Sequence, residues 1–459
     1  MASLASILLS AAIGWLLVYR FAGLAALRPR WAAWLLIFGA GAALGIAIAS
    51  CLFFLLLLLF PGVAHLALWV RLALLIAAGY VCFRGYRPGP PPAPAARYPY
   101  VPLLWIALAA ALCFVTLGMS AAWEANPHGD WDAWSIWNLR AKFLAAGDGL
   151  ASRAWSADMP ETHLVYPLLL SGFIASCWAD AGGGSPAAPI ATAYVFLLAL
   201  LAMVAGGVAV LRGPVGGLLA GLCLTGVPTL LHEVPSQYAD IPLACFLAGA
   251  VLAALLDRPA LAGALAGCAA WTKDEGILFV LVLAAAMALV KRPRLARFCV
   301  GAAPAAALVL VFKLAMARAP HTLMSGVPGG LAHRLVDLSR YRTAAWAMLR
   351  EIFTWNVGWY HPLLPVAILL IALRTHRRGL RDALFSAGVG LAVLLGYFGI
   401  YVVTPNDLQW QLQTSLTRLF IQVWPIGLIA AFLAMRMPQP VPAAAPAPVN
   451  PKPRRKGRS

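Results

Sequence analysis

Long apolar runs, separated by short polar or basic segments, dominate this chain. The run "LLIFGAGAALGIAIASCLFFLLLLLF" is longer than the roughly 20 residues that a helix needs to cross the hydrocarbon core of a bilayer. Runs of this kind recur as far as residue 436, and they lack the short alternating segments of a transmembrane β-barrel. We therefore expect an all-α polytopic membrane protein.

The apolar runs predict about thirteen membrane-spanning helices. They cover residues 3–19, 31–59, 64–83, 101–123, 188–211, 214–231, 239–256, 260–273, 276–290, 297–317, 361–373, 381–403 and 419–436. The first run lacks a basic leader and a cleavage site, so we expect it to remain as a helix. Residues 163–184, "HLVYPLLLSGFIASCWADAGGG", are short for a crossing and are expected to enter the membrane from the outer face as a half-helix.

Two proline-rich segments divide the chain. Residues 85–100, "GYRPGPPPAPAARYPY", predict a cytoplasmic linker between three helices in residues 1–84 and a larger transmembrane region in residues 101–436. Residues 437–459 predict a disordered basic tail in the cytoplasm.

The basic residues are clustered between the apolar runs. Of the whole chain, 62% is hydrophobic and only 11% is charged, yet the net charge is +18. Such clusters are typical of cytoplasmic loops, so the charge indicates orientation in a membrane and no nucleic-acid partner. With the clusters in the cytoplasm, the loop of residues 124–163 lies on the outer face.

The stretch "GDWDAWSIWNLRAKFL", residues 129–144 of that loop, combines acids, tryptophans and cations. Helical spacing separates its side chains into a polar and an apolar stripe. The polar stripe holds Asp132, Ser135, Asn138 and Lys142, and the apolar stripe holds Trp134, Trp137, Ala141 and Leu144. We expect an amphipathic helix on the outer surface, with its tryptophans at headgroup depth.

Two acids in this stretch compete for the same catalytic role. On a helix, residues two apart point about 200° away from each other, so Asp130 and Asp132 cannot both face one site if both are helical. Asp130 follows Gly129 and is well placed as an N-cap. Asp132 is the stronger candidate for chemistry, although it could also stabilise the helix dipole.

Two further outer turns carry candidate residues. Asp240 begins a span after a proline-containing turn, where it either caps the helix or belongs to a site. In "WTKDEG", Lys273 either pairs with Glu275 or holds a phosphate as a point charge.

The last candidates lie in "THLVYP" and "TSLTRL". Arg418 precedes the last span on the outer side, which favours an anion ligand over snorkelling toward the headgroups. His163 and Tyr166 could line the same site, although a loop histidine is more often inert. Because all these segments lie outside, we expect them to converge on one site in the outer leaflet.

With these residues in place, residues 101–436 resemble the GT-C superfamily of integral-membrane glycosyltransferases, particularly the bacterial relatives of protein O-mannosyltransferases and the lipid A aminoarabinose transferase. The resemblance rests on the order and common side of five segments. They are "GDWDAWSIWNLRAKFL", "YPLLL", "YADIPLACF", "WTKDEG" and "TSLTRL".

The resemblance implies a GT-C-like fold in a bacterial inner membrane, with the active site facing the periplasm. It implies transfer of a sugar from a polyprenyl-phosphate donor to a lipid, glycan or protein acceptor, usually with inversion. It assigns Asp132 as general base, Asp240 as a second-loop acid, and Lys273 and Arg418 as contacts to the donor phosphate. Some members of the superfamily use a divalent cation and others do not, so a metal stays open.

Two other functions remain as alternatives. A transporter or flippase of lipid-linked glycans would carry ionisable residues near mid-membrane and would show internal repeats. The charged candidates of this chain lie instead at the ends of spans, and no inverted repeat is visible. A non-catalytic assembly subunit is a third interpretation.

Overall fold

The computed structural model describes residues 2–60, 66–85, 98–147, 149–159, 162–317, 330–355 and 361–440. Most of the expected linker and the tail beyond residue 440 lie outside the described residues. Within these ranges the regular structure is helical and contains no strand, apart from one isolated bridge between Thr375 and Met435. The prediction of an all-α protein is confirmed.

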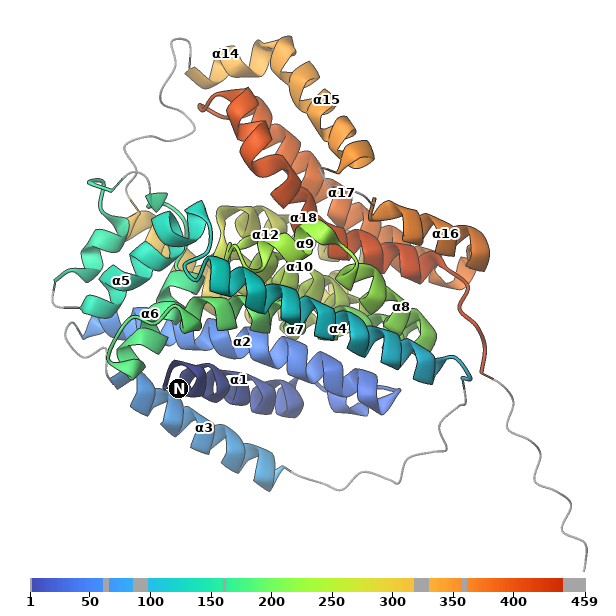
Figure 1. The fold of residues 1–459 in the computed structure, drawn as a ribbon, viewed down its shortest axis with the longest axis horizontal. Helices are drawn as coiled ribbons and strands as arrows, with labels where there is room; N and C mark the ends of the chain where they lie inside the picture. Colours follow the sequence, from blue (N-terminus) through green and yellow to red (C-terminus); the bar gives the residue numbers. More distant parts are fainter. Residues whose placement is uncertain are drawn as a thin grey trace, which may run out of the picture.

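The helices form an elongated bundle whose members run mostly along its long axis (Figure 1). The first half contains α1 (Ala2–Phe21), α2 (Arg30–Leu59), α3 (Leu66–Arg84), α4 (Val101–Ala125), α5 (Asn138–Ala146), α6 (Leu169–Ala181), α7 (Ala187–Arg212), α8 (Pro214–Thr225) and α9 (Pro228–Glu233). The second half contains α10 (Asp240–Leu255), α11 (Pro259–Thr272), α12 (Asp274–Val290), α13 (Leu295–Val311), α14 (Gly330–Val336), α15 (Leu338–Thr354), α16 (Leu363–Leu373), α17 (Leu380–Val403) and α18 (Leu408–Ala434).

Among the described residues, eight helical segments are long and apolar enough to cross a membrane. They are α1, α2, α3, α4, α7, residues 292–316 around α13, α17 and α18. Five shorter apolar helices, α6, α8, α10, α11 and α16, pack with them. This composition is that of a multi-pass membrane protein.

Helix boundaries agree with the apolar runs except in two places. The expected helix 214–231 breaks into α8 and α9 at Gly226. The last helix begins at Leu408, well before residue 419, so the prediction that Arg418 precedes it is wrong. The early turns of α18 are polar enough to escape a hydropathy reading, but Leu412 and Leu416 recur every fourth residue and bury one face.

The stretch after Gly129 is helical but does not lie free on a surface. Residues Ala133–Trp137 form a π-helical turn that leads into α5, and this wider turn changes which side chains face inward. Of the expected apolar stripe, Trp134 is 47% exposed whereas Trp137 is buried against the core, so the two tryptophans do not share one outward surface. Ser135 and Asn138 are buried too, and the Asn138 amide donates to Gln237 in the turn before α10.

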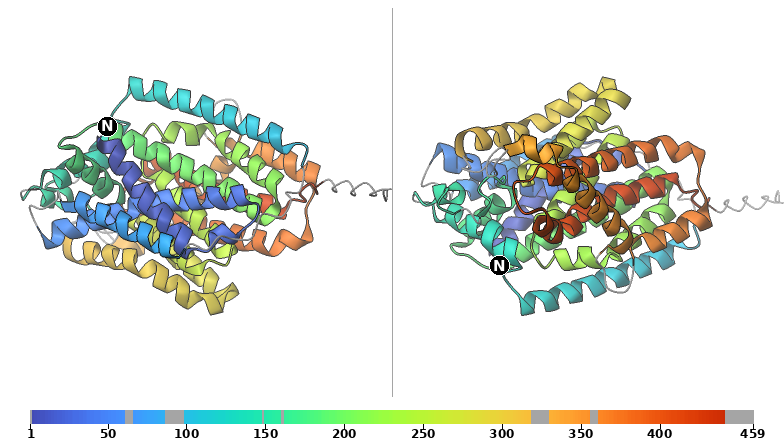
Figure 2. Two further views of the ribbon diagram at one scale, coloured as in Figure 1. Left: turned by 90° about the horizontal axis from the view of Figure 1, so that it is seen from below. Right: turned by 90° about the horizontal axis from the view of Figure 1, so that it is seen from above.

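The centre of the bundle is α10, in which each residue is buried. It packs among α7, α11 and α18. By contrast, α4 runs along one flank and buries few of its residues (Figure 2). The first residue of α10, Asp240, is therefore held at the middle of one end of the bundle.

The basic clusters that the sequence places on one side do gather at the opposite end. Arg294 forms an ion pair with Asp257 there, and Arg258 donates to the carbonyl of Gly23. The Arg212 guanidinium donates to the carbonyl of Met435. The described acidic turns and basic turns thus occupy different ends of the bundle.

Close backbone packing joins α1 to α2 at glycines. A β-carbon on Gly45 would lie 2.0 Å from the carbonyl oxygen of Ser10, and one on Gly14 would lie 1.9 Å from that of Gly41. Small residues let membrane helices approach this closely, which is where their association energy comes from.

We expect Gly45→Val to lower the melting temperature of the purified protein by roughly 5 °C, because the added carbons must push α1 and α2 apart. Gly118→Val in α4 is the matched control, since a β-carbon there meets nothing within 4 Å. Scanning fluorimetry in detergent measures both. Equal losses in the two variants would show that the close packing of α1 and α2 is not the cause.

Candidate functional site

Five charged side chains from widely separated segments meet at the end of the bundle where α10 begins. Asp132 comes from the first-loop helix and Asp240 from the start of α10. Lys273 ends α11, Glu275 lies in the first turn of α12, and Arg418 lies within α18. The convergence predicted from the common side of these segments is present in the structure.

The five groups form one alternating chain of charge. Arg418 Nη1 lies 2.5 Å from Asp132 Oδ2 and 3.9 Å from Asp240 Oδ2. On the other side of Asp240, Lys273 Nζ lies 3.1 Å from Asp240 Oδ1 and 3.1 Å from Glu275 Oε1. Each cation therefore bridges two carboxylates.

Helix α18 supplies a second donor to the same carboxylate. The amide nitrogen of Gln422, one turn after Arg418, donates to Asp240 Oδ1. The Gln422 oxygen in turn accepts from the hydroxyl of Tyr397 in α17, at 2.6 Å. Sequence reasoning missed both residues, because an amide and a phenol inside apolar helices carry no signal until the helices are packed.

The chain of charge is graded from the surface inward. The side chains of Asp132 and Arg418 are 22% and 18% exposed, whereas those of Asp240 and Lys273 are 2% and 5% exposed. A substrate arriving from outside would meet the Asp132–Arg418 pair first. The Asp240–Lys273 pair holds that outer pair in place from behind.

Asp130 is held apart from this chain of charge. Its carboxylate accepts from Ser236 Oγ at 2.6 Å and from the Asn126 amide at 3.1 Å. Its backbone oxygen accepts from the amides of Ala133 and Trp134, as the first residue of a helix does. The two first-loop acids are thus separated, and only Asp132 contacts Arg418.

Tyr166 forms an aromatic wall beside Lys273. The Lys273 ammonium lies 5.7 Å from the centre of the Tyr166 ring. That ring is stacked with His163 at 5.2 Å and with Trp137 at 5.7 Å. The buried guanidinium of Arg140 donates to the Tyr166 carbonyl and fixes this wall to α5.

Asp274 does not belong to the five-residue chain of charge and instead pairs with Lys313. Its carboxylate pairs with Lys313 at 2.6 Å, and Lys313 also donates to the carbonyl of Val165. The turn "WTKDEG" therefore directs Lys273 and Glu275 into the site and Asp274 toward the end of α13.

Glu233 is a buried acid that belongs to the site although the sequence did not single it out. Burial, and then the negative charge of Asp240, raise its pKa to about 8. Beside it, burial and then the charge of Asp132 raise the pKa of Tyr238 to about 12, and the Tyr238 ring lies 4.8 Å from the Arg418 guanidinium. The only signal in the sequence was the position of Glu233 in the same outer turn as Asp240.

Several buried polar atoms in this region have no hydrogen-bond partner within the described part of the protein. They include Arg418 Nε, Glu233 Oε2 and Glu275 Oε2. Buried polar groups are nearly always satisfied, so unsatisfied atoms gathered in one place indicate a site for a polar ligand or water.

The donor set does not fit a divalent cation. Asp132 and Asp240 already bind Arg418 and Lys273, and these cations lie between the acids. Across the described residues, no group of three or more His, Cys, Asp or Glu side chains is placed to hold a metal ion.

Comparisons of this chain with protein-family models, with curated proteins and with solved structures find no match.

The raised pKa of Glu233 predicts a stability that falls with pH. An unfolded glutamate ionises above its ordinary pKa of 4.5, whereas folded Glu233 stays protonated up to about 8. Between these values the unfolded state binds fewer protons, so each pH unit lowers the free energy of unfolding by at most about 1.4 kcal/mol.

Glu233→Gln removes this proton linkage. We expect the difference between the melting temperatures of Glu233→Gln and of the wild type to increase from pH 5 to pH 8. Above pH 8 this difference should level off. Scanning fluorimetry at pH 5, 6.5, 8 and 9 measures the difference. Glu124→Gln, which removes an exposed acid near the end of α4, is the control. A difference independent of pH would mean that Glu233 is ionised in the folded protein.

Proposed function

We propose that the protein is a membrane glycosyltransferase that moves a sugar from a polyprenyl-phosphate donor to a hydroxyl of a lipid, glycan or protein. The observation that carries the proposal is the Arg418 guanidinium bridging an accessible Asp132 and a buried Asp240. It lies at the end of an apolar helical bundle, where a lipid-linked substrate can reach it from the membrane.

Asp132 is the general base. A hydroxyl that attacks C1 of the sugar must lose its proton, which requires a carboxylate within about 3 Å. The new bond forms between the acceptor oxygen and C1, the bond between C1 and the phosphate oxygen breaks, and the acceptor proton passes to Asp132. The leaving phosphate is already stable as an anion, so cations suffice to hold it.

Arg418 holds both reacting groups. Its Nη1 donates to Asp132, which fixes the base, and its Nε has no partner among the described residues. A guanidinium carries five donors in a rigid fork, so Nε can donate to a phosphate oxygen while Nη1 stays on Asp132.

In this proposal Lys273 does not contact the donor phosphate but holds Asp240 in position. Its ammonium is buried and already pairs with Asp240 and Glu275. We therefore assign it to positioning Asp240, which lies opposite Arg418. This differs from the role that the GT-C resemblance implies, in which Lys273 contacts the phosphate.

The proposal includes the finer features that the resemblance implies. The fold would be GT-C-like, with about thirteen crossings once α8, α10, α11, α12 and α16 are added to the eight long helices. The acidic end would face the periplasm of a bacterial inner membrane, because the basic turns gather at the other end. A flippase is less favoured, since Asp132, Asp240 and Lys273 lie at helix ends.

We expect Asp132→Asn to lower the transfer rate at least about 100-fold, because the amide cannot accept the acceptor proton. Asp158→Asn is the matched control from the same loop, since its side chain is 73% exposed and pairs only with Arg153 and Ser156. The assay supplies purified protein in liposomes with polyprenyl-phospho-sugars. Undiminished transfer by Asp132→Asn would remove Asp132 as the base, and translocation of the donor without transfer would identify a flippase.

Arg418→Lys tests the double role of the guanidinium. Lysine keeps the charge but cannot hold Asp132 and a phosphate with two donors in one plane. We expect kcat to fall and KM for the donor to rise, each by roughly tenfold. Steady-state kinetics over a donor series measure both constants. A change in kcat alone would show that Arg418 does not contact the donor.

A further inference from the structure

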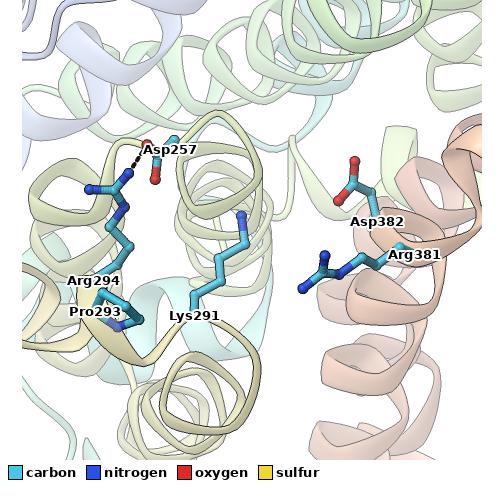
Figure 3. A pocket seen from close by; sticks show the side chains of 6 residues that line it. All are labelled: Asp257, Lys291, Pro293, Arg294, Arg381 and Asp382. Carbon is cyan, nitrogen blue, oxygen red and sulfur yellow. Dashed lines mark hydrogen bonds and ion pairs between the residues drawn. The ribbon is translucent and has the colours of Figure 1, made fainter.

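A second concentration of charge lies at the end of the bundle opposite the acidic site. It surrounds a cleft of about 440 Å³ between the turn joining α12 to α13 and the start of α17 (Figure 3). The lining residues are Asp257, Lys291, Pro293, Arg294, Arg381 and Asp382. Because α12 runs from the acidic site to this cleft, the two lie about 25 Å apart.

The cleft exists because α12 and α17 separate toward this end. Near the acidic site they pack tightly, since a β-carbon on Gly396 would lie 2.4 Å from the Leu278 side chain. At the other end, the long side chain of Lys291 spans from α12 to α17. Its ammonium lies 5.8 Å from the Phe385 ring in α17. The opening is therefore a wedge between two helices.

The positive charges in the wedge are incompletely neutralised, because three cations line it against two acids, Asp257 and Asp382. Arg294 pairs with Asp257 at 2.6 Å, and Lys291 donates one hydrogen bond to the Ala254 carbonyl, at 2.8 Å. Among the described residues, Arg381 makes neither an ion pair nor a hydrogen bond. Its side chain extends from α17 toward Lys291 (Figure 3).

Exposed leucines lie near these cations on the same two helices, outside the lining of the cleft. Leu289, two residues before Lys291, is 86% exposed, and Leu384, one turn after Arg381, is 63% exposed. In a membrane helix, exposed leucines face acyl chains and the neighbouring cations lie at the level of the lipid phosphates. This arrangement matches an amphiphile better than a soluble anion.

We propose that this cleft binds the phosphodiester headgroup of an anionic phospholipid, with its acyl chains along the diverging faces of α12 and α17. Arg381 and the free N–H groups of Lys291 hold the phosphate, and Arg294 lies at the rim. The proposal is independent of the glycosyltransferase, because none of these residues belongs to the acidic site.

Native mass spectrometry of the full-length protein, released from detergent with phosphatidylglycerol or phosphatidylcholine, tests the site. We expect each wild-type molecule to keep one more bound phosphatidylglycerol than bound phosphatidylcholine. A cation near the phosphate contributes roughly fivefold to affinity, so Arg381→Gln should weaken that retention about fivefold and Arg294→Gln/Arg381→Gln about 25-fold. Arg292→Gln/Arg297→Gln is the matched control, because both arginines are exposed at the same end and neither lines the cleft.

Equal losses in the cleft and control variants would overturn the proposal, since they would indicate attraction to basic surface in general. Inorganic phosphate, added to lipid-free protein, separates the lipid from a soluble anion. Thermal stabilisation by phosphate that depends on Arg381, without selective retention of phosphatidylglycerol, would also overturn it. Arg381→Gln alters an exposed, unpaired side chain, so its effect is readable even if the double variant folds poorly.

Discussion

The buried carboxylate of Asp240 is the constraint on which the acidic site depends. A charge removed from water is tolerated only when it is paired and hydrogen-bonded. Asp240 meets this condition with Lys273 from α11 and with Arg418 and Gln422 from α18. Removing any one partner leaves the others uncompensated, so α10, α11 and α18 must keep one arrangement at this end of the bundle.

That arrangement determines what the outer acid can do. Arg418 lies between the carboxylates of Asp132 and Asp240, so both acids set the position of its guanidinium. In the proposed reaction, a base held in this way would need little reorganisation when the acceptor arrives, which is the main advantage of a preorganised site. The π-helical turn after Asp132 aids this, because it buries Trp137 and anchors the first loop to the core.

Sequence patterns predicted the helices and the convergence of the charged turns for a simple physical reason. Apolar runs of membrane length have few alternatives to helix, and ionisable residues at their ends on one side are confined to one thin layer. Asp132, Asp240, Lys273 and Arg418 could therefore be grouped without knowing their contacts.

What the sequence could not predict depends on packing across helices. Gln422 and Tyr397 look like ordinary members of apolar spans until α17 and α18 place them behind Asp240. Likewise, Arg71 and Asp180 form a buried ion pair between α3 and α6, which neither helix reveals alone. The burial of Trp137 could not be predicted either, because it depends on a π-helical turn and on α6, neither of which its spacing shows.

The proposed reaction is consistent with the charge around Arg418. A sugar joined to a polyprenyl phosphate carries one negative charge on its phosphodiester, and the released phosphomonoester carries up to two near neutral pH. As that second charge develops on the phosphate, Asp132 takes up the acceptor proton and so loses its negative charge. The total charge beside the guanidinium therefore stays nearly constant through the reaction, while its distribution moves from Asp132 toward the leaving phosphate. In the proposed reaction, one arginine between base and leaving group would stabilise both states, provided that Asp240 keeps it in place.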